Sequence, residues 1–196
     1  MKRDGIGRKD ELDVVTRILH LGLVFFGLLA LATGNFAGDY KIVGGIGFSL
    51  HRWIGVGVAL LIGLRLAYGI WGPEEIRFIN WVPYTRERLR LVWEDVAGLA
   101  RFRLPERQPH QGVAALVETS GLLLFLFLAA SGLLLFFMIA QGHRAEGMTR
   151  AVKEFHEVAE VLLPLFFFGH GGAVLLHAMT GNHLWRKMVF LKNDGK

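Results

Sequence analysis

Histidine is the residue type in this sequence that points most directly to chemistry. Five of the eight histidines lie within or at the edge of long apolar segments, namely His20, His51, His156, His170 and His177. A neutral imidazole nitrogen is a good ligand for iron, and an ionisable side chain inside an apolar membrane segment is unfavourable enough to indicate a function. In a helix, the 14 residues from His156 to His170 correspond to a rise of about 21 Å, with both side chains within about 40° of the same face. The two imidazoles are therefore predicted to face one side of a helix at two depths.

The apolar segments that carry these histidines are long enough to cross a membrane. The chain has 196 residues, of which 53% are hydrophobic, and its mean hydropathy is +0.40. A bilayer core requires about 20 apolar residues in a helix. Four segments reach that length, at about residues 14–36, 42–71, 113–140 and 155–180. The sequence therefore predicts an all-α protein, with residues 1–196 forming one integral membrane domain built as a four-helix bundle.

The basic residues indicate the orientation of this bundle. The net charge is +5, but the basic residues stand beside the apolar segments, so we expect no nucleic-acid partner. They concentrate before the first segment, between the second and third, and after the fourth. By the positive-inside rule, those three regions are cytoplasmic, and both termini are expected on the cytoplasmic side.

The connection between the second and third segments is too long for a simple turn. Within it, residues 84–102 place Leu89, Val92 and Val96 at helical spacing, with arginines and acidic residues on the other side. This pattern is typical of a helix that lies along a membrane surface. We expect a cytoplasmic amphipathic surface helix here, and a solvated linker is the alternative.

The expected topology brings the histidines together in pairs. The first helix runs outward, so His20 lies near the cytoplasmic side, and the second runs inward, so His51 lies near the outer side. The fourth also runs inward, which places His156 near the outer side and His170 further in. Two pairs follow, His51 with His156 and His20 with His170, and each supplies two imidazoles from different helices, as six-coordinate haem iron needs. His177 shares the same face, and by depth alone it competes with His170 for the inner iron.

Other chemistries fit this sequence less well. The chain has no cysteine, which excludes disulfides, thiolate metal sites, iron–sulfur clusters and covalent c-type haem attachment within it. A di-metal carboxylate site needs inward acidic residues, and the apolar segments have almost none, with Glu118 as the main exception. Zinc sites need closer ligand spacing. A non-redox membrane anchor, whose histidines only pack, is the alternative from another class.

Short motifs in all four segments resemble those of a known family. "RILH" and a later "TG" stand in the first segment, "HRWIG" and "RLAYG" in the second, and "RFINWVP" and "PHQG" before the third. The fourth has two histidines 14 residues apart, then a glycine pair, then Met188. The set resembles the bacterial di-haem cytochrome b family of the cytochrome b-561 type, which includes the cytochrome b subunits of nickel–iron hydrogenases and formate dehydrogenases. The resemblance implies two haem b groups and favours His170 over His177. The axial ligands that it implies are His20, His51, His156 and His170.

The resemblance also implies a function and a location. It implies a multi-pass protein of the bacterial inner (cytoplasmic) membrane that passes electrons between a quinone pool and a redox partner. That partner is expected on the periplasmic side, as a hydrogenase, a dehydrogenase or a c-type cytochrome. The chain is then the electron-transfer subunit of a quinone-linked oxidoreductase complex. The alternative is a stand-alone quinone oxidoreductase of the cytochrome b-561 type.

Three arginines are candidates for binding haem carboxylates. Arg17 lies one turn from His20, and Arg52 is adjacent to His51. We expect them to neutralise propionates of the inner and outer haem, and ordinary placement at the membrane interface is the alternative. Arg65 lies deep in the second segment and is expected to face the bundle interior.

A quinone site is predicted where the third helix enters the membrane from the cytoplasmic side. His110 and Gln111 stand at this entrance, and Glu118 lies two turns further in. Gln111 is able to donate a hydrogen bond to a quinone carbonyl, and His110 or Glu118 to relay protons. In the resembling family this loop lies near the inner haem, and the position of Gln111 is often Asn. The alternative is that these polar residues only meet lipid headgroups.

Overall fold

The computed structural model describes residues 13–37, 46–139, 145–181 and 184–189, and every regular element in these ranges is a helix. The prediction of an all-α protein is therefore confirmed. The four long helices are α1 (Val14–Ala37), α2 (Ile46–Trp71), α5 (Gly112–Met138) and α6 (Gly147–Met179). Between α2 and α5 lie η2 (Glu74–Ile76), α3 (Phe78–Trp81) and α4 (Arg86–Leu99), and α7 (Leu184–Met188) follows α6.

The long helices correspond to the four predicted spans. Each is long and apolar enough to cross a membrane. Residues 42–45 and 140, which the sequence placed in the second and third spans, lie outside the described residues. α6 begins at Gly147, earlier than the predicted start of the fourth span near residue 155. The reason is that "MTRAVKE" is polar but contains neither Gly nor Pro, so the helix continues beyond the apolar run.

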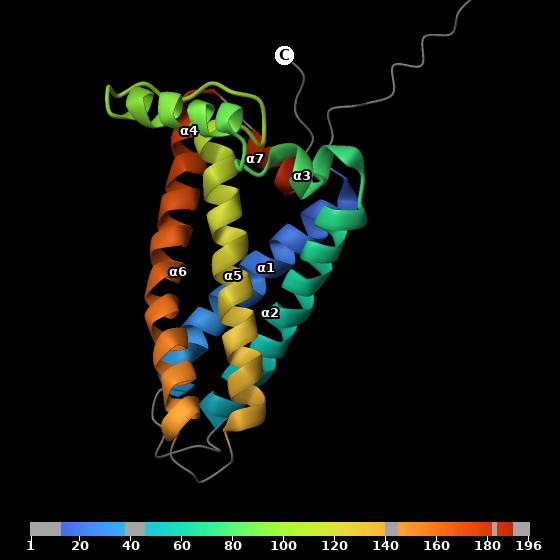
Figure 1. The fold of residues 1–196 in the computed structure, drawn as a ribbon, viewed down its shortest axis with the longest axis vertical. Helices are drawn as coiled ribbons and strands as arrows, with labels where there is room; N and C mark the ends of the chain where they lie inside the picture. The colour runs from blue at the N-terminus through green and yellow to red at the C-terminus, as the bar shows by residue number, and fades with distance from the viewer. Residues whose placement is uncertain (1–12, 38–45, 140–144, 182–183, 190–196) are drawn as a thin grey trace, which may run out of the picture.

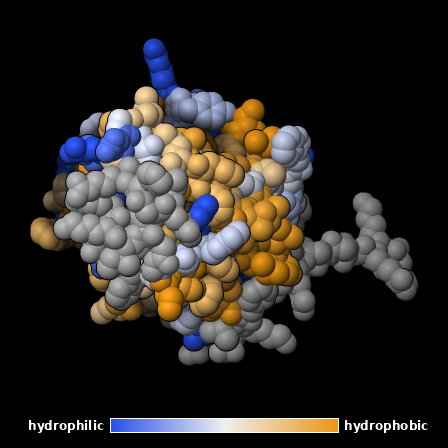
Figure 2. Space-filling model, turned by 90° about the horizontal axis from the view of Figure 1, so that it is seen from below, coloured by the Kyte–Doolittle hydropathy of each residue, from blue (hydrophilic) through white to orange (hydrophobic). Residues whose placement is uncertain are grey.

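Apolar side chains cover much of the outer surface of the long helices. Large exposed examples include Phe25, Leu60, Phe137 and Phe168. Figure 2 shows hydrophobic residues along the flanks of the bundle, seen from the end opposite α4. In the 18-residue apolar stretch of each span, only between 11% and 28% of the residues are buried within the chain. So large an apolar surface is stable only against lipid, and the helices satisfy their own backbone hydrogen bonds there. The chain is thus a multi-pass membrane protein.

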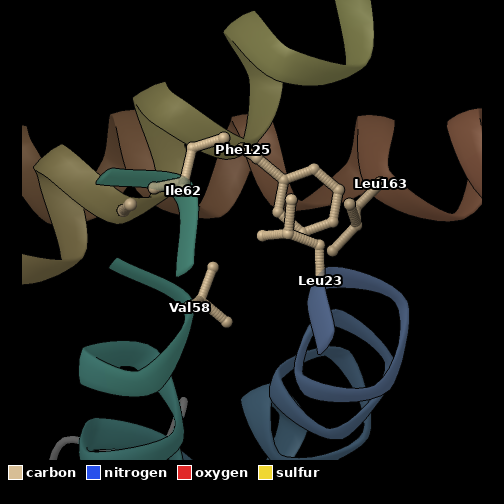
Figure 3. Close-up of a cluster of buried hydrophobic side chains, with 6 residues drawn as sticks. Leu23, Val58, Ile62, Phe125 and Leu163 are labelled. Atoms are coloured by element: carbon tan, nitrogen blue, oxygen red, sulfur yellow. The ribbon is translucent and has the colours of Figure 1, made fainter. Parts of the chain in front are cut away.

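The middle of the bundle is filled by a small apolar core. α1 packs along α2, α2 along α5, and α5 along α6, and Figure 1 shows α5 and α6 side by side with α1 crossing behind them. The core residues come from all four long helices and are Leu23, Val58, Ile62, Phe125, Ala129 and Leu163 (Figure 3). In lipid such contacts stabilise the bundle through close packing, which small residues permit. At Gly57, an added Cβ would come within 2.8 Å of the Phe26 ring.

α4 lies across the end of the bundle where α5 begins (Figure 1). Thr85 caps it, since its hydroxyl accepts a hydrogen bond from the backbone N–H of Arg88. The buried carboxylate of Asp95 accepts hydrogen bonds from Arg107 Nε at 2.5 Å and from the Val113 N–H at 3.0 Å. These contacts connect α4 to the first turn of α5 and so fix the position of the residues at the entrance to that helix.

Candidate functional site

At the end of the bundle opposite α4, two histidines face each other. His51 of α2 and His156 of α6 have ring centroids 6.3 Å apart, and we name them the outer pair. Metal–imidazole bonds are about 2 Å long, so two imidazoles on opposite sides of one metal ion have their ring centres about 6 Å apart. The outer pair therefore has the spacing that a single shared metal ion requires.

Hydrogen bonds set the tautomers of the outer pair. His51 Nδ1 lies 3.1 Å from the carbonyl oxygen of Ala30, and His156 Nδ1 lies 2.8 Å from Ser131 Oγ. The Ser131 hydroxyl donates to the carbonyl of Phe127 at 2.7 Å, so it accepts from His156. Both rings thus keep their proton on Nδ1 and present an unprotonated Nε2, which is the form that binds a metal.

An open pocket adjoins the outer pair. All four long helices line it, and its wall includes both histidines, Gly55, Gly132 and Glu160. A Cβ added at Gly55 would meet nothing within 4 Å. The glycine therefore leaves open a space beside the rings that a side chain would fill, and a flat cofactor fits such a space.

Arg52 also lies on the wall of this cavity. Its Nη2 donates a hydrogen bond to the carbonyl of Phe136 at 2.9 Å, and its guanidinium lies 3.7 Å from the centre of the Phe136 ring. The side chain thus folds against α5 beside the outer pair, where its charge is available to an anionic group.

The second pair lies toward the α4 end of the bundle. His20 of α1 and His170 of α6 have ring centroids 6.4 Å apart, and we name them the inner pair. Phe166 stacks on His170 with ring planes 5° apart. His20 Nδ1 is buried and has no hydrogen-bond partner among the described residues. His177 lies in the last turn of α6 and makes no ring contact with another histidine in that part of the chain. The structure thus brings His170, and not His177, to His20.

The two other candidate arginines lie in the same half of the bundle. Arg65 is buried, with its guanidinium 5.1 Å from the centre of the Phe78 ring, and its Nη1 has no partner among the described residues. A buried donor without a partner is unfavourable by about 1–3 kcal/mol, and more when charged, so this group is suited to an anion such as a haem propionate. Arg17 is half-buried one turn before His20.

His110 and Glu118 form a polar cluster where α5 begins. His110 Nδ1 lies 2.6 Å from Glu118 Oε2, and the Trp81 ring packs beside the imidazole at 5.4 Å. His110 has φ +62°, a left-handed conformation that is uncommon outside glycine and that often marks functional sites. Burial alone would lower the pKa of His110, but the hydrogen bond and the charge of Glu118 hold that pKa above its ordinary value of 6.5.

Gln111 does not join this cluster. It is the N-cap residue of α5, it makes no side-chain capping hydrogen bond, and its side chain is exposed. The structure therefore brings together two of the three residues that the sequence grouped at this entrance.

Sequence reasoning missed two residues of the outer half. Ser131 supports His156, and Glu160 faces the cavity. Each is a polar residue in an apolar span, which is itself a signal of function or of a buried partner. Their contacts depend on side-chain rotamers and helix crossing, which residue spacing does not specify.

A comparison with protein families identifies the family of this chain. A family model described as prokaryotic cytochrome b561 matches residues 11–190, a range that includes all four long helices and both histidine pairs. No curated protein and no solved structure matches the chain significantly. Because the family match covers nearly the whole chain, the protein belongs to the prokaryotic cytochrome b561 family, whose members transfer electrons through b-type haem in bacterial membranes.

Proposed function

We propose that the chain binds two haem b groups and conducts electrons across the membrane. The observation that carries this proposal is the presence of two histidine pairs, with ring centroids 6.3 and 6.4 Å apart, in the two halves of one bundle. When bound, each haem supplies an iron that gains and loses one electron. The protein supplies the ligating Nε2 atoms, and Arg17, Arg52 and Arg65 neutralise the propionates.

The two pairs are separated along the membrane normal. His156 and His170 lie 14 residues apart on α6, which is about 21 Å of helix. The apolar core that includes Leu163 lies between them in the bundle. The two haem sites thus provide two electron carriers within a bilayer that ions do not cross, one near each face.

Quinone is the proposed substrate at the inner haem. Reduction of its two carbonyls requires hydrogen-bond donors and two protons. His110 and Glu118 relay the two protons from the cytoplasm to the quinone, the two electrons come one at a time through the inner haem, and Gln111 provides a further amide at the helix entrance. The hydrogen bond between His110 and Glu118 supports this site because it already joins a donor to a proton acceptor.

The orientation proposed places the α4 end in the cytoplasm, with both termini on that side of the bacterial inner membrane. α4 exposes Leu89, Trp93 and Val96 on one stripe, while Val92 and Asp95 are buried against the bundle. This exposed stripe fits a surface helix whose apolar face rests in the headgroup region. The outer pair then lies near the periplasm, where a hydrogenase, a dehydrogenase or a c-type cytochrome exchanges electrons with it.

Quinol-driven haem reduction in isolated membranes tests the quinone site. Glu118→Gln and Gln111→Ala should slow this reduction while the haem content stays unchanged. Glu87→Gln is a matched control, because it removes an exposed carboxylate from α4 on the same side. Wild-type rates in both test variants, with haem intact, would place the quinone elsewhere. Copurification of a second redox subunit from native membranes separates a complex subunit from a stand-alone oxidoreductase.

A further inference from the structure

Glu160 is an acidic residue in the middle of a membrane-spanning helix to which the function above gives no role. It lies on α6, one turn deeper than His156, and its half-buried side chain lines the cavity of the outer pair. Within the described part of the chain its carboxylate has no hydrogen-bond or ion-pair partner. Acidic residues at such depth are rare and usually functional.

The surrounding backbone provides room for this side chain and places a second polar group, a backbone carbonyl, beside it. The Glu160 carboxylate lies against Gly34 of α1, at the place that a Cβ of residue 34 would occupy. Pro164 lies four residues further along α6 and has no N–H to donate to the Glu160 carbonyl. One turn of the helix therefore presents a carboxylate and a carbonyl that both need partners, beside an open cavity.

The charged and titratable groups around Glu160 come from two of the four helices. α2 contributes His51 and Arg52 to the same cavity. α6 contributes His156 and Glu157, whose negative charge interacts with Glu160. The cavity walls from α1 and α5 carry no titratable side chain among the described residues. Glu160 makes no hydrogen bond to either histidine. Its carboxylate would therefore affect a metal held by the outer pair through its charge alone.

We propose that Glu160 is a proton acceptor coupled to the electron on the outer haem. This inference rests on the proposed function, in which the outer pair holds a haem. Glu160 gains one proton from the outer aqueous side when the iron gains one electron from the redox partner, and it loses that proton when the electron leaves. Glu157 lies three residues away, is exposed toward the outer end of α6 and is ion-paired with Lys153, so it stands between Glu160 and solvent.

The physical basis is the charge of the iron centre. Oxidised iron carries one more positive charge than reduced iron, and attraction across a cavity of low dielectric favours an ionised Glu160 in the oxidised protein. The midpoint potential of the outer haem should therefore fall with rising pH over the range in which the proton is exchanged. A tenfold change corresponds to 59 mV for one electron, so the slope should approach but not exceed about 59 mV per pH unit.

Redox titration of the purified protein at several pH values tests this inference. In Glu160→Gln one haem component should lose its pH dependence. Its potential should match that of the wild type at low pH, where Glu160 is neutral, and lie above it at high pH. Glu154→Gln removes an exposed carboxylate of α6, ion-paired with Arg150, and should keep the wild-type slope. Glu160→Asp retains a carboxyl group and should restore a slope.

The outcomes separate the inference from the function on which it rests. Absence of bound haem b in the wild type overturns both. If Glu160→Gln binds two haems and the slope of midpoint potential against pH is unchanged, the inference alone is overturned. An equal change of this slope for both haems also overturns it. Gly34→Ala provides an independent test, because its methyl group takes the place of the carboxylate. The pH range of the slope must then move, and an unmoved range contradicts the role of Glu160.

Discussion

The hydroxyl of Ser131 is expected to strengthen haem binding at the outer pair. It accepts the Nδ1–H of His156 at 2.8 Å. In Ser131→Ala this N–H stays buried without a partner whenever Nε2 ligates iron, because a neutral imidazole has a single ring proton. An orphaned buried donor is unfavourable by about 1–3 kcal/mol. At about 1.4 kcal/mol per tenfold change, the affinity of the outer pair for haem should fall by roughly 5- to 150-fold. This range agrees with the ~10- to 100-fold losses typical when a group that orients a metal-bound histidine is removed.

Ser120 of the same helix provides the matched control. Its hydroxyl donates to the carbonyl of Leu116 at 2.8 Å, as Ser131 does to Phe127, but it is exposed and contacts no histidine. Both substitutions therefore remove a hydroxyl bonded to its own helix, and only one affects a ligand. Haem transfer to an excess of an apoprotein acceptor, followed by absorbance, measures the difference. One haem should leave Ser131→Ala faster, and Ser120→Ala should behave as the wild type. Equal haem retention in the two variants would show that the Ser131 hydroxyl does not strengthen haem binding.

Three further predictions follow from the site. His170→Ala should lose one of two haems, while His177→Ala, on the same helix, should keep both, as counted by the haem content of each purified variant; the reverse result would exchange their roles. Gly55→Leu should abolish the outer haem by filling the cavity, whereas Gly63→Leu, on the exposed side of α2, should not. Equal haem absorbance spectra of the two variants would contradict the cavity assignment. Because the pKa of His110 is raised in the folded protein, its ion pair stabilises fully below its unfolded value near 6.5 and is lost as pH rises through the folded value. The difference in Tm between wild type and His110→Gln should therefore shrink toward alkaline pH, and a difference that grows with pH would rule out this ion pair.

The architecture was predictable because membrane spans depend on a coarse property of the sequence. A run of about 20 apolar residues forms a helix in lipid whatever its details. The start of α6 at Gly147 was not predicted, because the helix continues into polar sequence. The length of an apolar run says nothing about where such a polar extension ends. Within the loop, helical spacing at Leu89, Val92 and Val96 indicated α4, whose observed range Arg86–Leu99 lies inside the predicted 84–102.

The contacts of the candidate site were predictable where they depend only on how deep each histidine lies along its helix. The direction of each helix and the position of His51 and His156 along it suffice to place them at one level. Contacts such as that of Ser131 with His156 depend on the rotation of α5 about its axis, which spacing within one helix does not determine. Gln111 shows the same limit, since adjacency to His110 in sequence did not place its side chain in the cluster. Depth also left His170 and His177 unresolved, and the helix packing distinguishes them.

We propose above that this one chain holds two haem b groups, each between two histidines. The pyridine haemochrome assay, performed with a protein determination on the same purified sample, tests it most directly. The expected result is two haem b per chain, both low-spin in the electron paramagnetic resonance spectrum of the oxidised protein, as two imidazole ligands require. One haem or none per chain, or a high-spin haem in the intact protein, would contradict it.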